Sequence, residues 1–276
     1  MLGIVAGGGD LPFAIAQSVH ESGGKVFVVA LRGLTDPWVE DFAHEWTALG
    51  ELGKALKYLH ANKCDPVLLA GRVARPKWNA LKLDARGALM LPKVIKAAAK
   101  GDDALLRVFV ELFESEGFKV CGVAQAAPGL LATEGTITAR KPDDANNADI
   151  ALGIKVVRTL GALDVGQAVA VCDGLVLAVE AAEGTDLMIE RVAALPDTLR
   201  GRPGKLRGVL VKALKPVQDG KTDLPVIGVA TVERVAAAGL AGIAVEAGRS
   251  LIVNRSAVIA AADKAGVFVT GFASDA

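Results

Sequence analysis

Cysteine, histidine and aromatic residues are scarce in this chain of 276 residues, which has three cysteines, three histidines and 4% aromatic residues. The cysteines, Cys64, Cys121 and Cys172, are widely spaced and form no CxxC pair. We therefore expect reduced thiols in the core rather than disulfide bonds. The histidines stand alone, without an HxH or HExxH pattern, which gives a zinc site little support.

The chain also lacks an excess of charge of either sign and a long apolar run. Its formal net charge is zero, which argues against nucleic acid as a partner. No uninterrupted apolar run approaches the roughly 20 residues of a membrane span. The first residues have no basic segment followed by a long apolar one, so no signal peptide is visible. We expect a cytoplasmic protein.

Aliphatic residues dominate what is present. Hydrophobic residues make up 52% of the chain, so with few aromatics the core must consist of Ala, Val, Leu and Ile. That mixture suits parallel strands covered by helices. The length allows two domains, and a turn-rich, polar stretch over residues 124–148 places their junction near residue 130. The sequence therefore predicts two α/β domains joined by a linker, residues 1–130 and 131–276, the first Rossmann-like with a mostly parallel sheet.

A glycine-rich turn follows the first predicted strand, residues 2–6, and precedes a helix predicted over residues 13–21. Glycines there let backbone amides approach a ligand, and a helix N-terminus favours an anion. We expect Asp10 to cap the helix. An ordinary structural turn explains the pattern equally well. It departs from GxGxxG because Pro12 stands where the third glycine belongs, and no acidic residue ends the second strand, so a nicotinamide dinucleotide is disfavoured.

Gly71 and Arg72 lie just past the carboxyl end of another predicted strand, residues 67–70, where open parallel sheets bind ligands. From there to residue 107 basic residues outnumber acidic ones, the basic positions being 72, 75, 77, 82, 86, 93, 96, 100 and 107. This local positive field suits a diphosphate or an anionic membrane surface. Solvated faces of ordinary helices are the alternative, since several lysines recur at helical spacing.

The C-terminal half carries acidic residues at predicted strand ends. A hairpin over residues 168–180 is indicated by its Asp-Gly turn, and Glu180, Glu183 and Asp186 follow at the start of the next helix. Carboxylates so close together could hold Mg²⁺. They could equally favour the first turn of the helix, together with Thr185.

Residues 208–231 combine a short apolar strand with basic and acidic side chains. Lys212 and Lys215 end the strand, and Asp219 and Asp223 follow within the next loop. Carboxylates can hold a divalent cation and lysines can neutralise phosphate. A polar loop between a strand and a helix is the simpler interpretation of the same residues.

The two halves together favour a substrate that has a nucleotide diphosphate and a second bulky group. Arg249, after a strand predicted over residues 242–246, would clamp a phosphate or form a surface ion pair. No P-loop, Ser-His-Asp arrangement or kinase signature is present. A sugar-nucleotide oxidoreductase or transferase, and a non-catalytic sensor of nucleotide or lipid, remain open at this point.

Several short segments, taken in order, resemble one known family along essentially the whole chain. They are residues 6–12, 70–76, 101–107, 180–186, 212–219, 223–228 and 238–249. The family is the UDP-2,3-diacylglucosamine pyrophosphatase family that some Gram-negative bacteria use in lipid A synthesis. Lys221 departs from it, because an arginine is expected there, and lysine keeps the charge but lacks the planar fork of a bidentate contact.

The resemblance implies a magnesium-dependent hydrolase. It would convert UDP-2,3-diacylglucosamine to 2,3-diacylglucosamine 1-phosphate (lipid X) and UMP, with water attacking the α-phosphorus. The first domain would hold UDP and the second the acylated sugar, in a protein peripheral to the inner face of the inner membrane. A homodimer is compatible with this picture.

The resemblance also assigns roles to residues. Asp223 would be a metal ligand or base, with Asp219 as a secondary candidate, and Lys212 and Lys215 would balance phosphate charge. Further expected metal ligands are Glu180 and Asp186. Residues expected to bind substrate are Gly8, Gly9, Asp10, Leu11, Gly71, Arg72, Asp102, Thr185 and Arg249.

Overall fold

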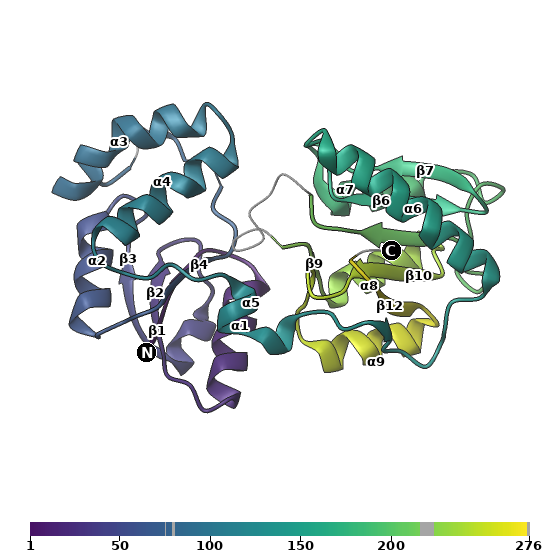
Figure 1. Cartoon of the computed structure of the whole chain (residues 1–276), viewed down its shortest axis with the longest axis horizontal. Helices are drawn as coiled ribbons and strands as arrows, with labels where there is room; N and C mark the ends of the chain where they lie inside the picture. The colour runs from purple at the N-terminus through teal and green to yellow at the C-terminus, as the bar shows by residue number, and fades with distance from the viewer. Residues whose placement is uncertain (75, 79–80, 216–223, 275–276) are drawn as a thin grey trace. The chain divides into compact units, whose positions relative to one another are not determined.

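A computed structural model describes residues 1–74, 76–78, 81–215 and 224–274, apart from the side chains of residues 102 and 103. The chain divides into two compact units, Met1–Gly129 and Leu130–Ala276 (Figure 1). Each unit contains its own sheet and its own apolar core. The predicted α/β fold class is therefore confirmed.

The N-terminal unit is built on a parallel sheet with the strand order β3-β2-β1-β4. Its strands are β1 (Leu2–Ala6), β2 (Val26–Leu31), β3 (Ala43–Thr47) and β4 (Val67–Ala70). Helix α1 (Asp10–Glu21) connects β1 to β2, a 3₁₀ turn (Pro37–Asp41) precedes β3, and α2 (Leu52–Ala61) connects β3 to β4. The strand order reverses between β1 and β4, so the loops after these two strands flank the position where such sheets bind ligands.

Two further helices follow β4. Helices α3 (Ala85–Ala98) and α4 (Asp102–Ser115) lie side by side and share an apolar cluster of Val94, Ala97 and Val108 (Figure 1). The chain then returns to the sheet through a single bridge between Val120 and Val67. Residues 119–122 form no strand longer than this bridge, because the short helix α5 (Val123–Ala126) begins directly after them and a 3₁₀ turn (Pro128–Leu130) follows.

The C-terminal unit has a six-stranded sheet with the order β5-β12-β10-β8-β6-β7. These strands are β5 (Gly135–Thr136), β6 (Ala168–Cys172), β7 (Leu175–Val179), β8 (Val209–Lys212), β10 (Gly242–Glu246) and β12 (Phe268–Phe272). Its centre, β8, β10 and β12, is parallel, and the flanking strands run antiparallel. Two short strands, β9 (Val226–Ile227) and β11 (Leu251–Ile252), form a separate parallel pair.

Helices cover both faces of this second sheet because its strands alternate between two apolar clusters. Val209 and Val211 of β8 belong to the cluster of α6 (Asp144–Ala162). Leu210 belongs to the cluster formed by α7 (Gly184–Ala193), α8 (Val229–Ala237) and α9 (Arg255–Ala265). By the same alternation, Lys212 at the end of β8 lies on the face of α7 and α8.

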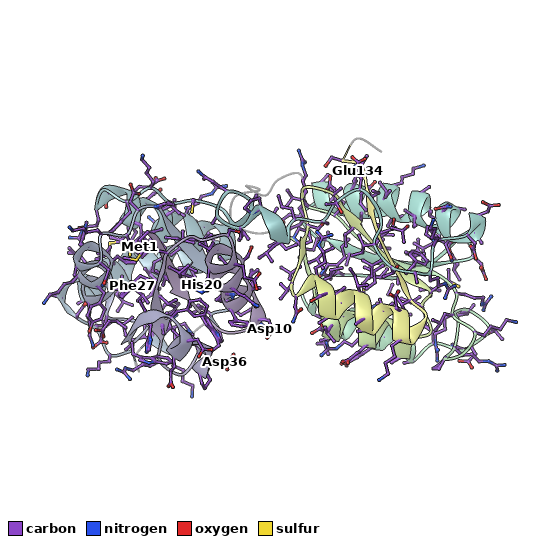
Figure 2. All side chains as sticks on the ribbon, turned by 90° about the horizontal axis from the view of Figure 1, so that it is seen from below. Met1, Asp10, His20, Phe27, Asp36 and Glu134 are labelled. Atoms are coloured by element: carbon purple, nitrogen blue, oxygen red, sulfur yellow. The ribbon has the colours of Figure 1, made fainter. Side chains whose placement is uncertain are left out.

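The side chains shown in Figure 2 fill the interiors of both units. The three cysteines are buried and unpaired, as predicted, and burial raises the pKa of each thiol. Among the described helices, none has both the length and the apolar character needed to cross a membrane.

Candidate functional site

The glycine turn after β1 is tied to the segment after β4 by backbone hydrogen bonds. The amide of Gly7 donates to the carbonyl of Ala70 at 2.8 Å. The amide of Gly8 donates to the carbonyl of Arg72 at 2.9 Å, and the amide of Arg72 donates back at 2.8 Å. The predicted residues Gly8, Gly71 and Arg72 are thus brought together at the point where the strand order reverses.

Glycine is required at position 71 by both conformation and space. Its φ is +95°, in the left-handed region, and a Cβ there would lie 2.8 Å from the carbonyl carbon of Gly7 and from Cγ of Pro12. A side chain would therefore push the two segments apart. The close approach of the two backbones depends on this residue.

Helix α1 begins at this turn with its first amides uncapped by any side chain. Its N-cap is Gly9, with φ of +89°, so the prediction that Asp10 caps the helix is wrong. Asp10 is instead the first helical residue and is exposed (Figure 2). The predicted Leu11 follows it within the first turn. Amides at a helix N-terminus are donors for an anion.

The guanidinium of Arg72 lies next to this helix end. A Cβ added to Gly9 would lie 3.4 Å from both Nε and Nη2 of Arg72. Arg72 is exposed and forms no ion pair within the part of the chain that the structure describes. The guanidinium and the positive end of the helix repel each other, but an anion bound between them is attracted by both. The arrangement therefore suits a phosphate group.

Thr35 stabilises the start of the glycine turn after β1, and the sequence did not single it out. Its hydroxyl donates to the carbonyl of Ala6 at 2.5 Å and accepts from the amide of Leu31 at 2.9 Å. The side chain is buried and links the ends of β1 and β2. A single threonine in a loop gives no sequence signal for this contact.

Three predicted residues of the C-terminal unit form one chain of hydrogen bonds. The ammonium of Lys212 donates to Oγ1 of Thr185 at 3.0 Å and to the carbonyl of Val226 at 3.2 Å. The hydroxyl of Thr185 donates to Oε1 of Glu180 at 3.1 Å. The other oxygen of Glu180 accepts from the amide of Gln167 at 3.3 Å. Lys212 and Glu180 are only 4% and 7% exposed, so opposite charges are buried together and connected through a hydroxyl.

Glu246 lies at the same end of the sheet as Lys212 but on the opposite face. The sequence did not single it out. It ends β10 and is buried. Its Oε2 accepts from the amide of Leu214 at 3.0 Å, and its Oε1 accepts from the hydroxyl of Ser274 at 2.9 Å. The carboxylate therefore fixes the backbone just after β8, in the segment that leads toward Asp219 and Asp223.

The remaining charged candidates in this unit lie nearer the surface. Lys215 forms an ion pair with Asp164 at 2.6 Å, and Asp186 lies 3.5 Å from the guanidinium of Arg234. Arg249 is exposed and forms no ion pair with any described residue. None of these contacts joins the hydrogen-bonded chain of Lys212, Thr185 and Glu180.

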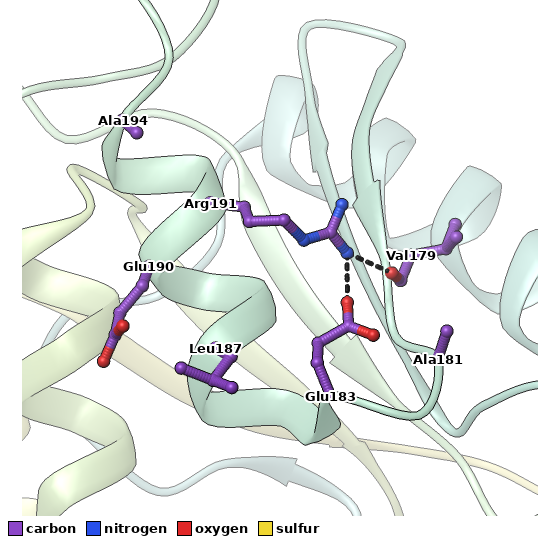
Figure 3. Close-up of a pocket in the computed structure, with 7 residues that line it drawn as sticks. All are labelled: Val179, Ala181, Glu183, Leu187, Glu190, Arg191 and Ala194. Carbon is purple, nitrogen blue, oxygen red and sulfur yellow. Dashed lines mark hydrogen bonds and ion pairs between the residues drawn. The ribbon is translucent and has the colours of Figure 1, made fainter.

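An open hollow of about 780 Å³ lies between the end of β7 and α7 (Figure 3). Its lining residues are Val179, Ala181, Glu183, Leu187, Glu190, Arg191 and Ala194. Arg191 pairs with Glu183 and donates to the carbonyl of Val179 at 2.8 Å. The pKa of Glu183 is lowered by a hydrogen bond from its own amide and by Arg191. The pair stabilises the turn between β7 and α7, which directly precedes Thr185 in the first turn of α7.

Comparison with known proteins agrees with this division into two units. Residues 1–130 match the family description "LpxI N-terminal domain", and residues 133–270 match "LpxI C-terminal domain". The chain belongs to the LpxI family. A member from Caulobacter vibrioides, named UDP-2,3-diacylglucosamine pyrophosphatase LpxI, is 49% identical over 270 residues, covering 98% of this chain and 96% of that protein.

A solved structure, the CobK precorrin-6A reductase, is similar to this LpxI-family chain at only 12% identity. It covers 99% of this chain, and 87% of its own chain is matched, with a TM-score of 0.30. A similarity this weak carries no argument about fold or function.

The described carboxylates of this LpxI-family chain do not make a cation site by themselves. Residues 1–74, 76–78, 81–215 and 224–274 contain no group of three or more His, Cys, Asp or Glu side chains placed to hold a metal ion. Both oxygens of Glu180 already accept hydrogen bonds, and Asp186 faces Arg234. Asp219 and Asp223 lie outside the described residues, as does the side chain of Asp102.

Proposed function

We propose that this chain hydrolyses UDP-2,3-diacylglucosamine to 2,3-diacylglucosamine 1-phosphate and UMP, with water attacking the α-phosphorus. The observation that carries the proposal is its nearly full-length similarity, at 49% identity, to the pyrophosphatase of that name from C. vibrioides. Both domains of the family are present in order. The pyrophosphatase activity rests on this similarity, and the structure suggests how residues of each unit contribute.

The N-terminal unit would bind the UDP moiety. Its glycine turn exposes the N-terminal amides of α1, and Arg72 adds a guanidinium beside them. A diphosphate carries negative charge that both groups stabilise. The position is where parallel sheets of this topology bind nucleotides. Gly8, Gly9, Asp10, Leu11 and Gly71 would act through the backbone there, and Asp102 would contact the substrate from the start of α4.

The C-terminal unit would bind the acylated sugar and carry out the hydrolysis. The buried ammonium of Lys212 is held in one orientation by Thr185 and by the carbonyl of Val226. A fixed cation stabilises charge that develops on a phosphate without having to reorganise. In this proposal Lys215 and Arg249 add positive charge near the phosphate, and Asp223, with Asp219 second, activates water or holds a cation.

A magnesium requirement belongs to the same proposal but gains no support from the described carboxylates. Glu180 would have to give up its bonds to Thr185 and to the amide of Gln167 to become a ligand. We therefore derive no step through a metal ion. Rates measured after EDTA treatment and after adding back Mg²⁺, Mn²⁺ or Ca²⁺ test the requirement directly.

Hydrolysis in oxygen-18 water tests the reaction itself. The purified chain is incubated with UDP-2,3-diacylglucosamine in detergent micelles with Mg²⁺, and the masses of the products are measured by mass spectrometry. Label in UMP is expected, since it reports attack at the α-phosphorus. Label in the sugar phosphate would instead mean attack at the β-phosphorus. Binding of substrate without release of UMP over hours would overturn the hydrolase proposal in favour of a sensor.

The proposed substrate carries two acyl chains, so we further propose that the protein works peripherally at the inner face of the inner membrane. We also propose that it has no nucleic-acid partner, since its formal net charge is zero. A homodimer is compatible with this arrangement. The mass in solution, measured by light scattering over a range of concentrations, determines whether the dimer forms.

A further inference from the structure

Helix α3, like the shorter α2, carries basic side chains and no acidic ones. Its residues, Ala85–Ala98, include Arg86, Lys93 and Lys96 but no aspartate or glutamate. One side of the helix packs on α4 through the apolar cluster of Val94, Ala97 and Val108. The charge of the opposite side is therefore positive wherever it is not neutralised by neighbours.

The outer side of α3 also exposes apolar side chains. Leu89 is 72% exposed and Ile95 is 40% exposed, and Pro92 between them is exposed as well. Leu89, Pro92 and Lys96 follow the spacing of three and four residues that places side chains on one helical face. Lys100 extends this face beyond the helix end.

The cations of this face differ in their partners. Lys93 forms an exposed ion pair with Glu111 of α4 at 2.8 Å. Lys96 and Lys100 are exposed and form no ion pair with any residue in the described part of the chain. The face thus combines exposed apolar groups with two lysines that pair with no described side chain. We call Leu89, Pro92, Ile95, Lys96 and Lys100 the α3 face.

We propose that the α3 face binds the surface of an anionic phospholipid membrane, with Leu89 and Ile95 at the level of the acyl chains and Lys96 and Lys100 on the head groups. A helix with apolar residues flanked by lysines is the kind that lies in a membrane interface. Each lysine near an anionic surface adds attraction. The inference rests on the proposed function only in that an acylated substrate must be taken from a membrane.

The charge pattern favours a lipid surface over a second copy of the chain. A symmetric dimer through the α3 face would bring the same lysines of two chains together, and like charges repel. An anionic membrane pairs with them instead. The C-terminal unit shows the contrast, since its most exposed leucine, Leu163, at 71% exposed, is followed by Asp164, which pairs with Lys215.

Vesicle flotation with the full chain tests the proposal. Vesicles of phosphatidylethanolamine with about one third phosphatidylglycerol are compared with vesicles of phosphatidylcholine alone, which are electrically neutral. The wild-type chain is expected to float with the anionic vesicles and much less with the neutral ones. Leu89→Gln and Lys96→Glu are each expected to weaken partitioning by about ten-fold, since one removes apolar burial and the other reverses a charge.

Two matched variants control for exposure and for charge. Leu163→Gln removes a leucine as exposed as Leu89, and Lys155→Glu reverses an exposed lysine on α6. Both should partition like the wild type. The proposal fails if the wild type does not float with anionic vesicles, if Leu89→Gln floats unchanged, or if the control variants are weakened equally. It also fails if Leu89→Gln abolishes a dimer seen by light scattering while flotation is unchanged.

Hydrolysis in detergent micelles separates this proposal from the proposed function. Leu89→Gln and Lys96→Glu should keep the wild-type rate on micellar substrate, because the α3 face contains none of the residues assigned to catalysis or to UDP. A chain that floats but releases no UMP would contradict the proposed function and leave the α3 face supported. A chain that hydrolyses micellar substrate but does not float would support the proposed function and contradict membrane binding by the α3 face.

Discussion

The carboxyl ends of the strands are built differently in the two sheets. We call them the first edge in the N-terminal unit and the second edge in the C-terminal unit. The edge of the N-terminal unit is made of backbone, with Gly8 bonded to Arg72 and the helix N-terminus at Gly9 left open. The edge of the C-terminal unit is made of buried charged side chains, Lys212 and Glu180 on one face and Glu246 on the other. Backbone amides can bind a phosphate with little cost of burial, whereas buried charges are costly unless paired. The first edge suits recognition of an anion, and the second suits fixed charges at a reaction centre.

The largest effect should come from Asp223→Ala, which tests whether the reaction depends on a carboxylate of the C-terminal half. Loss of a group that activates water or stabilises the transition state should lower turnover by about 100-fold or more. Binding of UDP, which we assign to the first edge, should remain close to that of the wild type. Turnover is measured at saturating substrate and Mg²⁺, and UDP binding by calorimetry. A turnover near the wild-type value would remove Asp223 from the mechanism.

Lys212→Met should destabilise the C-terminal unit and sharpen the contrast with the first edge. The change leaves Glu180 buried without its cationic neighbour, which costs about 3 kcal/mol in unfolding free energy by analogy with broken buried pairs. Turnover should fall as well. Lys215→Met is the matched control, because Lys215 pairs with the exposed Asp164, and such a pair contributes about 1 kcal/mol or less. Equal destabilisation by the two variants, measured by urea unfolding, would contradict the role given to the hydrogen-bonded chain.

Arg72→Lys should weaken UDP binding by about ten-fold while the fold remains intact. Lysine keeps the charge but loses the planar fork that holds a phosphate through two bonds. Arg32→Lys is the control, since Arg32 follows β2 and its guanidinium lies 6.0 Å from the ring centroid of Trp46 rather than beside Gly9. If both variants bind UDP like the wild type, the first edge does not recognise the diphosphate through Arg72.

Strands that are uninterrupted aliphatic runs could be predicted closely. Residues 2–6 and 67–70 appear as β1 and β4 at the predicted bounds, because each apolar run ends at a glycine and is buried on both faces. Strand β3 was not predicted, since Ala43–Thr47 reads Ala-His-Glu-Trp-Thr and forms the edge of the sheet, where polar side chains are tolerated. Strand β9 has only two residues, too few for a pattern.

The site could be predicted only where one rule applies locally. Gly8 and Arg72, which the structure brings together, were candidates because ligands bind past the carboxyl ends of parallel strands. The chain of Lys212, Thr185 and Glu180 could not be derived, because it depends on how α7 packs over the end of β8. Glu246 illustrates the same limit, since its partner amide belongs to Leu214, 32 positions earlier, and no spacing rule connects them.

The smallest predicted effect concerns Cys172, which lies beside the hairpin turn of the C-terminal unit. Burial raises the pKa of this thiol from 9.0 to about 11, with the neighbouring Asp173 adding to the shift. The folded chain therefore keeps the thiol protonated where the unfolded chain ionises it. The resulting contribution to stability is complete below pH 9 and is lost as the pH rises toward 11. At pH 10 the loss should be about 1 kcal/mol relative to pH 8.

A comparison of wild type with Cys172→Ala isolates this contribution. Urea unfolding of each chain at pH 8 and pH 10 gives four free energies of unfolding, and titration of all other groups is common to both chains. The wild type should lose about 1 kcal/mol more than the variant between the two pH values. An equal loss would mean that the thiol of Cys172 ionises as readily in the folded chain as in the unfolded one. The hairpin between β6 and β7 would then be open to solvent at Cys172. In that case the C-terminal sheet would not be tightly packed at β6, unlike the rest of its core.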